Sequence, residues 1–260
     1  MMLADVVFAK KWELDALRHV LRPGALDILE HAQRIDITFT SNAIEGNALT
    51  AGETVLILEK GITVSGKPLK DHLETVEHAK ALTWVLDVAG RKDAPITEAD
   101  LRNLHRLAVG QSSQGNAGRY ADRPRSMDTG TSALDFPAPA KIPTLVADLL
   151  AWLDERQYEP ATAFEAHLRL VRIHPFNDGN GRTARLLMNL ILARSGFPPI
   201  AVRPEDRPAY LRALDTAQSG GGAEAFKDLL FHRLDKTLDI YLDAARQAQN
   251  TPLEATLQST

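Results

Sequence analysis

The sequence contains no cysteine. This absence excludes disulfide bridges, zinc sites built on thiolates and cysteine nucleophiles. The chain also lacks any run of about 18 consecutive apolar residues, so we expect no membrane-spanning helix. Basic residues are not in excess: the formal net charge is −4, which argues against nucleic acid as a partner. The remaining composition is that of an ordinary soluble protein with enough apolar residues for a core.

The N-terminal stretch gives no sign of export. Residues 1–11 have no sustained apolar segment, so we expect no signal peptide and a cytoplasmic location. The length of 260 residues suits one large domain, or one domain plus a small helical extension. We expect an N-terminal helical region at residues 1–60, the main domain at 61–250 and a disordered tail at 251–260.

Apolar residues recur at helical spacing through most of the chain, which predicts an all-α fold. Two capping boxes mark helix starts: Thr50 with Glu53, and Thr97 with Asp100. A further short helical turn is expected at residues 41–46. Residues 183–194 are apolar on most sides, which predicts a central, buried helix. The expected helices cover residues 6–20, 25–39, 51–60, 70–89, 98–109, 143–155, 161–173, 183–194, 208–218, 223–231 and 234–249.

Residues 110–143 are the least helical part of the chain and are rich in glycine and proline. A loop of this length inside a compact domain is usually functional or disordered. Weak alternation between Ser126 and Pro137 predicts a small β-hairpin around Gly130.

The most informative stretch of the chain places a histidine, a carboxylate, two glycines and two arginines within twelve residues. Apolar helical runs lie on both sides of it. The residues are His174, Pro175, Phe176, Asn177, Asp178, Gly179, Asn180, Gly181, Arg182, Thr183, Ala184 and Arg185.

These residue types suit chemistry on phosphate groups. Pro175 disfavours helical backbone at His174, so the preceding helix should end there and present the imidazole from a loop. An imidazole near its ordinary pKa can accept a proton from a hydroxyl at neutral pH. Asp178 offers a hard oxygen ligand for a magnesium ion that already carries phosphate oxygens.

The second half of the stretch suits an anion. Gly179, Asn180 and Gly181 let consecutive backbone N–H groups point inward, and the helix that follows adds its N-terminal dipole. Arg182 and Arg185 lie one helical turn apart, so both can reach phosphates. Together these groups predict a nucleotide di- or triphosphate held beside a base.

The twelve residues resemble the His-Pro-Phe-x-[Asp/Glu]-Gly-Asn-Gly-Arg-x-x-Arg signature of Fic (Fido) proteins at every fixed position. The resemblance implies a Fic-type helical bundle with a small β-hairpin flap, and a protein adenylyltransferase that moves AMP from ATP to a Ser, Thr or Tyr hydroxyl. Residues 61–250 would then form the Fic catalytic domain. The segment from Gly118 is similar to the region that leads into the flap, where a target segment would pair by β-augmentation.

The same resemblance implies a role for each signature residue. His174 would deprotonate the target hydroxyl, and Asp178 would hold Mg²⁺ (or Mn²⁺) on the α- and β-phosphates. Asn180 and the backbone from Gly179 to Gly181 would cradle the phosphates, and Arg182 with Arg185 would hold the β- and γ-phosphates. Phe176 is expected to be buried beneath the loop. Tyr210 is either an aromatic residue beside the nucleotide or a core tyrosine.

A second motif, Ser41-Asn42-Ala43-Ile44-Glu45-Gly46-Asn47, is similar to the family's inhibitory motif [Ser/Thr]-x-x-x-Glu-[Gly/Asn]. Ser41 and Glu45 are neighbours on one helix face. The Glu45 carboxylate could pair with Arg185 and occupy the guanidinium that would otherwise bind the γ-phosphate. The position, N-terminal to the core in the same chain, resembles the class that carries its own inhibitor (class II-like).

Three alternatives stay open. Glu45 could instead orient water towards an AMP-modified hydroxyl, which would make the chain a de-AMPylase or a bifunctional enzyme. The transferred group could be phosphate or UMP. The chain could also be a non-catalytic nucleotide-binding interaction module. The target protein is not fixed by the sequence, and both self-AMPylation and a homodimer are compatible with it.

Overall fold

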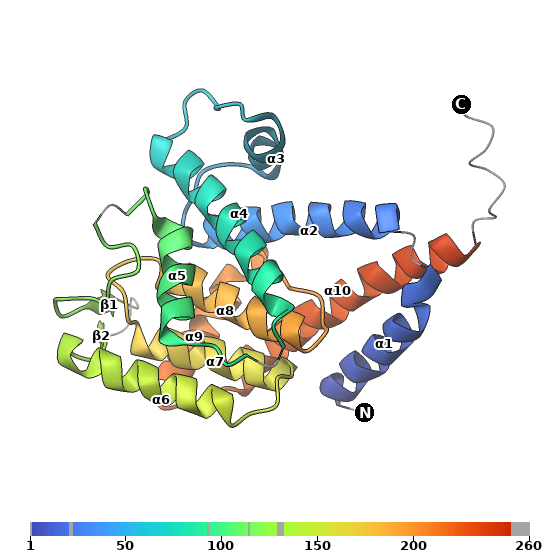
Figure 1. Ribbon diagram of the computed structural model, residues 1–260. Coiled ribbons are helices and arrows are strands. Elements are labelled where there is room, and N and C mark those ends of the chain that lie inside the picture. The colour runs from blue at the N-terminus through green and yellow to red at the C-terminus, as the bar shows by residue number, and fades with distance from the viewer. Residues whose placement is uncertain (1, 21–22, 93, 114, 129–132, 251–260) are drawn as a thin grey trace.

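The computed structural model describes residues 2–20, 23–92, 94–113, 115–128 and 133–250. Within these residues the chain forms ten α-helices, three short 3₁₀-helices and one pair of strands (Figure 1). The predicted disordered tail at 251–260 lies outside the described residues. The helices are α1 (Leu3–Leu17), η1 (Arg18–Val20), α2 (Pro23–Ile44), α3 (Ala51–Lys60), α4 (Leu69–Ala89), α5 (Glu98–Val109), η2 (Pro139–Lys141), α6 (Ile142–Asp154), α7 (Pro160–Ile173), α8 (Asn180–Arg194), η3 (Pro204–Asp206), α9 (Arg207–Gln218) and α10 (Glu224–Asn250).

Both predicted capping boxes are confirmed. The Thr50 hydroxyl accepts a hydrogen bond from the Glu53 N–H (3.2 Å), and the Glu53 carboxylate accepts one from the Thr50 N–H (2.7 Å). Thr97 and Asp100 make the same reciprocal pair at the start of α5. These caps satisfy N–H groups that have no partner inside a helix. They fix where α3 and α5 begin.

Two predicted helix breaks are wrong. Residues 41–44 continue α2 instead of forming a separate turn, because the polar residues there are buried against neighbouring helices: Arg185 of α8 donates to the Ser41 hydroxyl (2.9 Å), and the Asn42 amide donates to the Glu74 carbonyl of α4 (3.4 Å). The break predicted near residue 232 is also absent, since α10 runs unbroken from Glu224 to Asn250. Fully or nearly fully buried residues recur every four positions across that point: Phe226, Leu230, Leu234, Leu238 and Leu242.

Helix α8 lies at the centre of the molecule, as its apolar sequence predicts. It packs against α7, α4, α5 and α2 (Figure 1). It begins at Asn180, three residues before the predicted start, because Gly179 adopts a left-handed conformation (φ 73°) and precedes the first turn. Gly181 and Arg182 therefore belong to the first turn of a buried helix.

The long 110–143 segment contains two short strands, β1 (Ser126–Asp128) and β2 (Ala133–Asp135), which pair antiparallel with Ser126 opposite Asp135. The predicted turn around Gly130 lies outside the described residues, so the link that would make this pair a hairpin is not described. In the described part of the chain, none of the helices combines the length and apolar character needed to cross a membrane.

Candidate functional site

His174 stands where α7 ends. Its backbone is left-handed (φ 49°, ψ 57°), and its N–H donates to the Leu170 carbonyl (2.9 Å). Among the described residues other than glycine it alone has a positive φ. This conformation costs free energy for a residue with a side chain, and such strain is concentrated at functional sites. The predicted helix end before Pro175 is confirmed, and the strained backbone aims the imidazole out of the helix.

Two residues at the base of the strand pair fix the orientation of His174. The Phe136 ring stacks on the imidazole with centroids 3.7 Å apart and planes 16° from parallel. The Arg125 guanidinium donates to the His174 carbonyl and to the Pro137 carbonyl (2.8 Å for the latter). The segment that carries β1 and β2 is therefore attached directly to His174.

Burial, followed by the positive charge of Arg125, lowers the pKa of His174 to about 4, and the smaller effects of Glu45 and Asp178 oppose this. The sequence-based expectation of an imidazole near its ordinary pKa is wrong, because Phe136 covers one face of the ring. At neutral pH the imidazole is therefore in its neutral form, with one ring nitrogen unprotonated. It is free to accept a proton but is a weaker base than an exposed histidine.

We expect the free energy of unfolding to fall as the pH drops below about 6.5. Burial lowers the pKa of His78 and His167 to about 3 and that of His105 and His174 to about 4. Above the unfolded pKa of 6.5 these rings are neutral in both states; below it the unfolded chain binds protons that the folded chain cannot.

Each of these histidines should lower stability by up to about 1.4 kcal/mol per pH unit between its unfolded and folded pKa. Urea unfolding at pH 7.5 and pH 5.0 measures the loss. Replacing the exposed His232 with glutamine serves as the control and should leave the pH dependence unchanged. Equal stability at the two pH values would show that the four rings titrate normally in the folded chain.

The loop after His174 is held in place by His105 of α5. The His105 Nδ1 accepts from the Gly118 N–H (2.9 Å), so the opposite nitrogen, Nε2, donates to the Asp178 carbonyl (2.9 Å). The same ring stacks on Phe176 with centroids 3.7 Å apart. Phe176 is fully buried, as predicted. His105 thus sets the backbone position of Asp178, whose side chain is 46% exposed.

Gly179 and Asn180 close this loop. A Cβ on Gly179 would lie 2.5 Å from a Val109 methyl group, and its φ of 73° disfavours any side chain, so glycine is required. Asn180 is buried, and its amide both accepts from the Phe176 N–H (2.9 Å) and donates to the Phe176 carbonyl (2.8 Å). The Asn180 side chain therefore acts within the loop in this structure.

Arg182 and Arg185 point to different neighbours. Arg182 is 2% exposed and forms ion pairs with Glu74 of α4 (3.2 Å) and with Asp178 (3.6 Å). Glu74 also accepts from the Asn47 side chain (3.1 Å). Arg182 thus connects Asp178 to α4, whereas the sequence alone indicated a direct phosphate contact for both arginines.

Arg185 makes the ion pair with Glu45 that the inhibitory motif predicted. Its NH2 lies 2.7 Å from Glu45 Oε1 and 2.9 Å from the Ser41 carbonyl, and its Nε donates to the Ser41 hydroxyl (2.9 Å). The Glu45 carboxylate also lies against the Cα of Gly181, where a Cβ would collide with it. The carboxylate therefore occupies the N-terminal turn of α8, which is a preferred place for an anion.

A cavity of about 410 Å³ joins these groups. His174, Gly181, Arg185 and Glu45 all line it, whereas Asp178, Asn180 and Arg182 do not. Its remaining wall comes mainly from α9, with single residues from α2, α7 and the segment after β2. These are Ile44, Phe136, Val171, Arg207, Tyr210, Leu211, Arg212, Leu214, Asp215 and Gln218.

Tyr210 combines the two readings that the sequence left open. It lines the cavity, yet it is 1% exposed, and its hydroxyl lies 2.7 Å from His167 Nε2. Sequence reasoning missed His105, Phe136, Arg125 and Glu74. Phe136 lies within the predicted flap, but nothing in the local sequence distinguishes it from a core aromatic.

Comparisons with known proteins identify the family. The family model described as Fic/DOC matches residues 95–192. A Fic domain containing signaling protein from Bacteroides thetaiotaomicron superimposes with a TM-score of 0.86 at 30% identity, over 95% of this chain and 97% of that one. The chain belongs to the Fic/DOC family. The all-α, Fic-type fold predicted from the signature is thereby confirmed.

Other relatives of this Fic protein agree. Fic-1 from Caenorhabditis elegans superimposes with a TM-score of 0.79 at 30% identity, over 92% of this chain and 71% of that one. "Protein adenylyltransferase Fic" of Nematostella vectensis is 38% identical over 208 residues, which are 78% of this chain and 48% of that protein. The chain spans about half the length or less of the curated relatives first compared with it.

Proposed function

We propose that this chain is a protein adenylyltransferase that transfers AMP from ATP to a hydroxyl side chain of a protein and is restrained by Glu45. One observation carries the proposal: His174, the N-terminal turn of α8 and the Arg185–Glu45 ion pair line the same cavity. A base, an anion site and an internal anion that competes for that site are thus brought together. The related adenylyltransferases support the reaction class.

In this proposal His174 accepts the proton of the incoming hydroxyl as that oxygen attacks the α-phosphate of ATP; the bond from the α-phosphorus to the α,β-bridging oxygen breaks, and pyrophosphate leaves. The neutral state of the imidazole at pH 7 suits this role. The remaining phosphates lie at the start of α8, where Gly181 has no side chain and the Arg185 guanidinium is within reach. Asn180 and Arg182 act indirectly: Asn180 holds the loop in place, and Arg182 holds Asp178 in place.

The residues present fit a magnesium ion that arrives with ATP. Among the described residues there is no group of three or more metal-binding side chains. Asp178 is a single, half-exposed carboxylate. Magnesium is commonly held by one or two carboxylates together with substrate phosphates, so a lone aspartate suffices. When bound, the ion neutralises phosphate charge, and this chain contributes Asp178 to hold it.

The position of the label in ATP tests the proposed reaction. The Glu45→Gly variant, incubated with Mg²⁺ and with ATP labelled at the α-phosphate, should become labelled itself or label a protein in a lysate. With the purified variant alone, ATP labelled at the γ-phosphate should give no protein-bound label, and a chelator should abolish the reaction with α-labelled ATP. Protein-bound γ-label would show that phosphate and not AMP is transferred. The absence of label from either nucleotide would reject the proposal.

The position of Glu45 also favours a second reaction, the removal of AMP from a modified protein. Its side chain is 36% exposed and lines the cavity together with His174, so it can hold a water molecule towards a phosphodiester there. A protein carrying AMP on a hydroxyl should then release AMP with the unsubstituted chain and not with Glu45→Gly. Equal release by both chains would remove this second reaction from consideration.

The strand pair is our candidate for the target-docking flap. It lies next to Phe136, which stacks on His174, so a segment paired with the strands would reach the base directly. Backbone pairing of this kind binds an extended peptide with little demand on its sequence. The target is accordingly proposed to offer its hydroxyl from an extended segment.

A further inference from the structure

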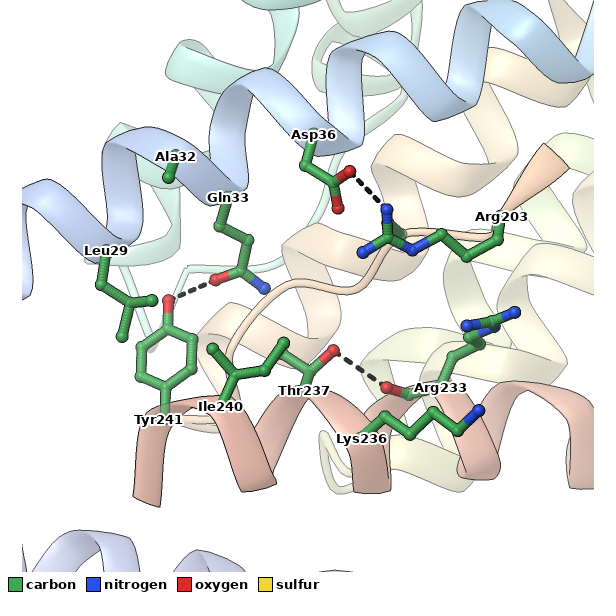
Figure 2. A pocket seen from close by; sticks show the side chains of 11 residues that line it. Leu29, Ala32, Gln33, Asp36, Arg203, Arg233, Lys236, Thr237, Ile240 and Tyr241 are labelled. Carbon is green, nitrogen blue, oxygen red and sulfur yellow. Dashed lines mark hydrogen bonds and ion pairs between the residues drawn. The ribbon is translucent and has the colours of Figure 1, made fainter. Parts of the chain in front are cut away.

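A second cavity, of about 310 Å³, lies between α2, α10 and the segment before η3 (Figure 2). Its size is at the lower end of the range for small-molecule sites, about 300–1,000 Å³. It does not share a lining residue with the cavity that contains His174.

The lining of this α2–α10 cavity is apolar at one end and charged at the other. Leu29, Ala32, Ile240 and the ring of Tyr241 form the apolar end (Figure 2). The charged end holds three cations and one carboxylate. These are Arg203, Arg233, Lys236 and Asp36.

The charges at that end are unevenly paired. Asp36 lies 2.5 Å from Arg203, and Arg233 is held from the η3 side by Asp206 and Glu205. Lys236 is exposed and makes no hydrogen bond or ion pair within the described part of the chain. With Asp206 and Glu205 included, the carboxylates equal the cations in number, and Lys236 interacts with Asp206 only at longer range. Among the three lining cations Lys236 alone has no ion pair, so it is the group that can receive an anion.

Asp36 occupies the position that such an anion would take. Burial raises the pKa of Asp36 even though Arg203 opposes the shift, so the pairing does not fully offset the cost of burying this carboxylate. A ligand that brings its own negative charge, on a body that fills the apolar end, can therefore compete with Asp36 for Arg203.

We infer that the α2–α10 cavity binds a small amphipathic anion, with an apolar or aromatic body and one carboxylate, sulfonate or phosphate group, in competition with Asp36. The inference has a consequence that rests on the proposed function. Asp36 belongs to the helix that ends next to Glu45, and Arg207, four residues after Arg203, donates to the Ile44 carbonyl (2.8 Å). An anion that separates Arg203 from Asp36 loosens α2 and weakens the hold of Glu45 on Arg185.

Binding of 1-anilinonaphthalene-8-sulfonate, followed by its fluorescence, tests the site without any enzymatic reaction. Lys236→Gln should weaken binding about fivefold, because one charge contact is lost. The isosteric Asp36→Asn should strengthen it by a similar factor, because the competing charge is removed. Lys60→Gln, which removes an exposed lysine on α3, is the matched control and should change nothing.

The uncharged probe N-phenyl-1-naphthylamine carries the same rings without the sulfonate, and neither substitution should affect its binding. Opposite shifts for Lys236→Gln and Asp36→Asn cannot come from damage to the fold, which would weaken both. The inference is overturned if both variants bind the sulfonate as the unsubstituted chain does, or if the uncharged probe follows the same pattern.

The effect of the bound anion on AMP transfer is measured in a separate experiment. The sulfonate should raise AMP transfer by the unsubstituted chain and leave that of Glu45→Gly unchanged, since that variant has no inhibitory contact to lose. If Glu45→Gly transfers no AMP at all, the proposed function fails while the binding result still stands. If Glu45→Gly is active and the sulfonate leaves the unsubstituted chain at its basal rate, the link through α2 is rejected.

Discussion

Glu45→Gly should raise the rate of AMP transfer by about tenfold to a hundredfold. The Glu45 carboxylate lies 2.7 Å from Arg185 and fills the first turn of α8, so phosphates must displace it. A hydrogen bond to a charged group contributes about 1.5–3 kcal/mol. Its loss should therefore increase the fraction of molecules in which Arg185 can bind phosphate by about the same factor as the rate. Initial rates with α-labelled ATP measure the increase.

Two matched variants separate charge from backbone effects. Glu45→Gln keeps the shape and removes the charge, so it should give an intermediate increase. Glu155→Gln removes an exposed carboxylate at the end of α6, away from α2, and should leave the rate unchanged. If Glu45→Gly binds ATP and transfers AMP no faster than the unsubstituted chain, the inhibitory role of Glu45 is wrong.

The same substitution should lower the thermal midpoint of the protein when ATP is absent. Arg185 is 4% exposed, and without Glu45 its remaining partners are the uncharged Ser41 and the Tyr210 hydroxyl, so a buried cation loses its counter-ion. ATP should restore the midpoint of the variant more than that of the unsubstituted chain, because a ligand stabilises in proportion to how tightly it binds the folded state.

His174→Ala, introduced together with Glu45→Gly, should reduce AMP transfer by about a hundredfold to ten-thousandfold and leave ATP affinity nearly unchanged. General-base catalysis accounts for a factor of this size, and the imidazole belongs to the residue that ends α7, not to the start of α8. Single-turnover rates and ATP titrations of the two variants separate the chemical step from binding. Substantial transfer by the doubly substituted chain would remove His174 as the base.

The pH dependence gives an independent check on His174. With its pKa near 4, transfer by Glu45→Gly should be flat between about pH 6 and 8 and should fall only in more acidic solution. Phe136→Leu uncovers the ring, so the acidic limb should move towards the ordinary histidine pKa of 6.5. Arg125 and Asp178 remain in both chains and do not account for a difference. An unmoved limb would show that Phe136 does not control the titration.

The sequence predicted the parts of the site that lie close together in the chain. Residues 174–185 hold His174, the glycine turn and Arg185 in one stretch, so spacing alone indicated their proximity. Contacts between residues that lie far apart in the sequence were harder to predict. Glu45 was found because its motif resembles one already known, whereas Glu74 and His105 lie in ordinary amphipathic helices and reach the site only through packing.

The helix boundaries show the same difference between local and long-range interactions. Caps such as Thr50–Glu53 are local, and their helix starts were predicted correctly. The interruptions predicted within α2 and α10 were wrong because tertiary packing decides there: a run of polar residues is buried in α2, and one apolar row continues along all of α10. Propensity is a weak guide where burial on a neighbouring helix supplies most of the stability.

The closed loop around Asn180 has a consequence for nucleotide affinity. Both hydrogen bonds of its amide are made within the protein, so the loop that we propose receives the phosphates would need no ordering when ATP binds. The apparent dissociation constant should then equal the intrinsic one divided by the fraction of molecules in which the end of α2 has moved off Arg185. The ratio of ATP affinities between the Glu45→Gly variant and the unsubstituted chain would therefore report that fraction directly, as a population measured by titration.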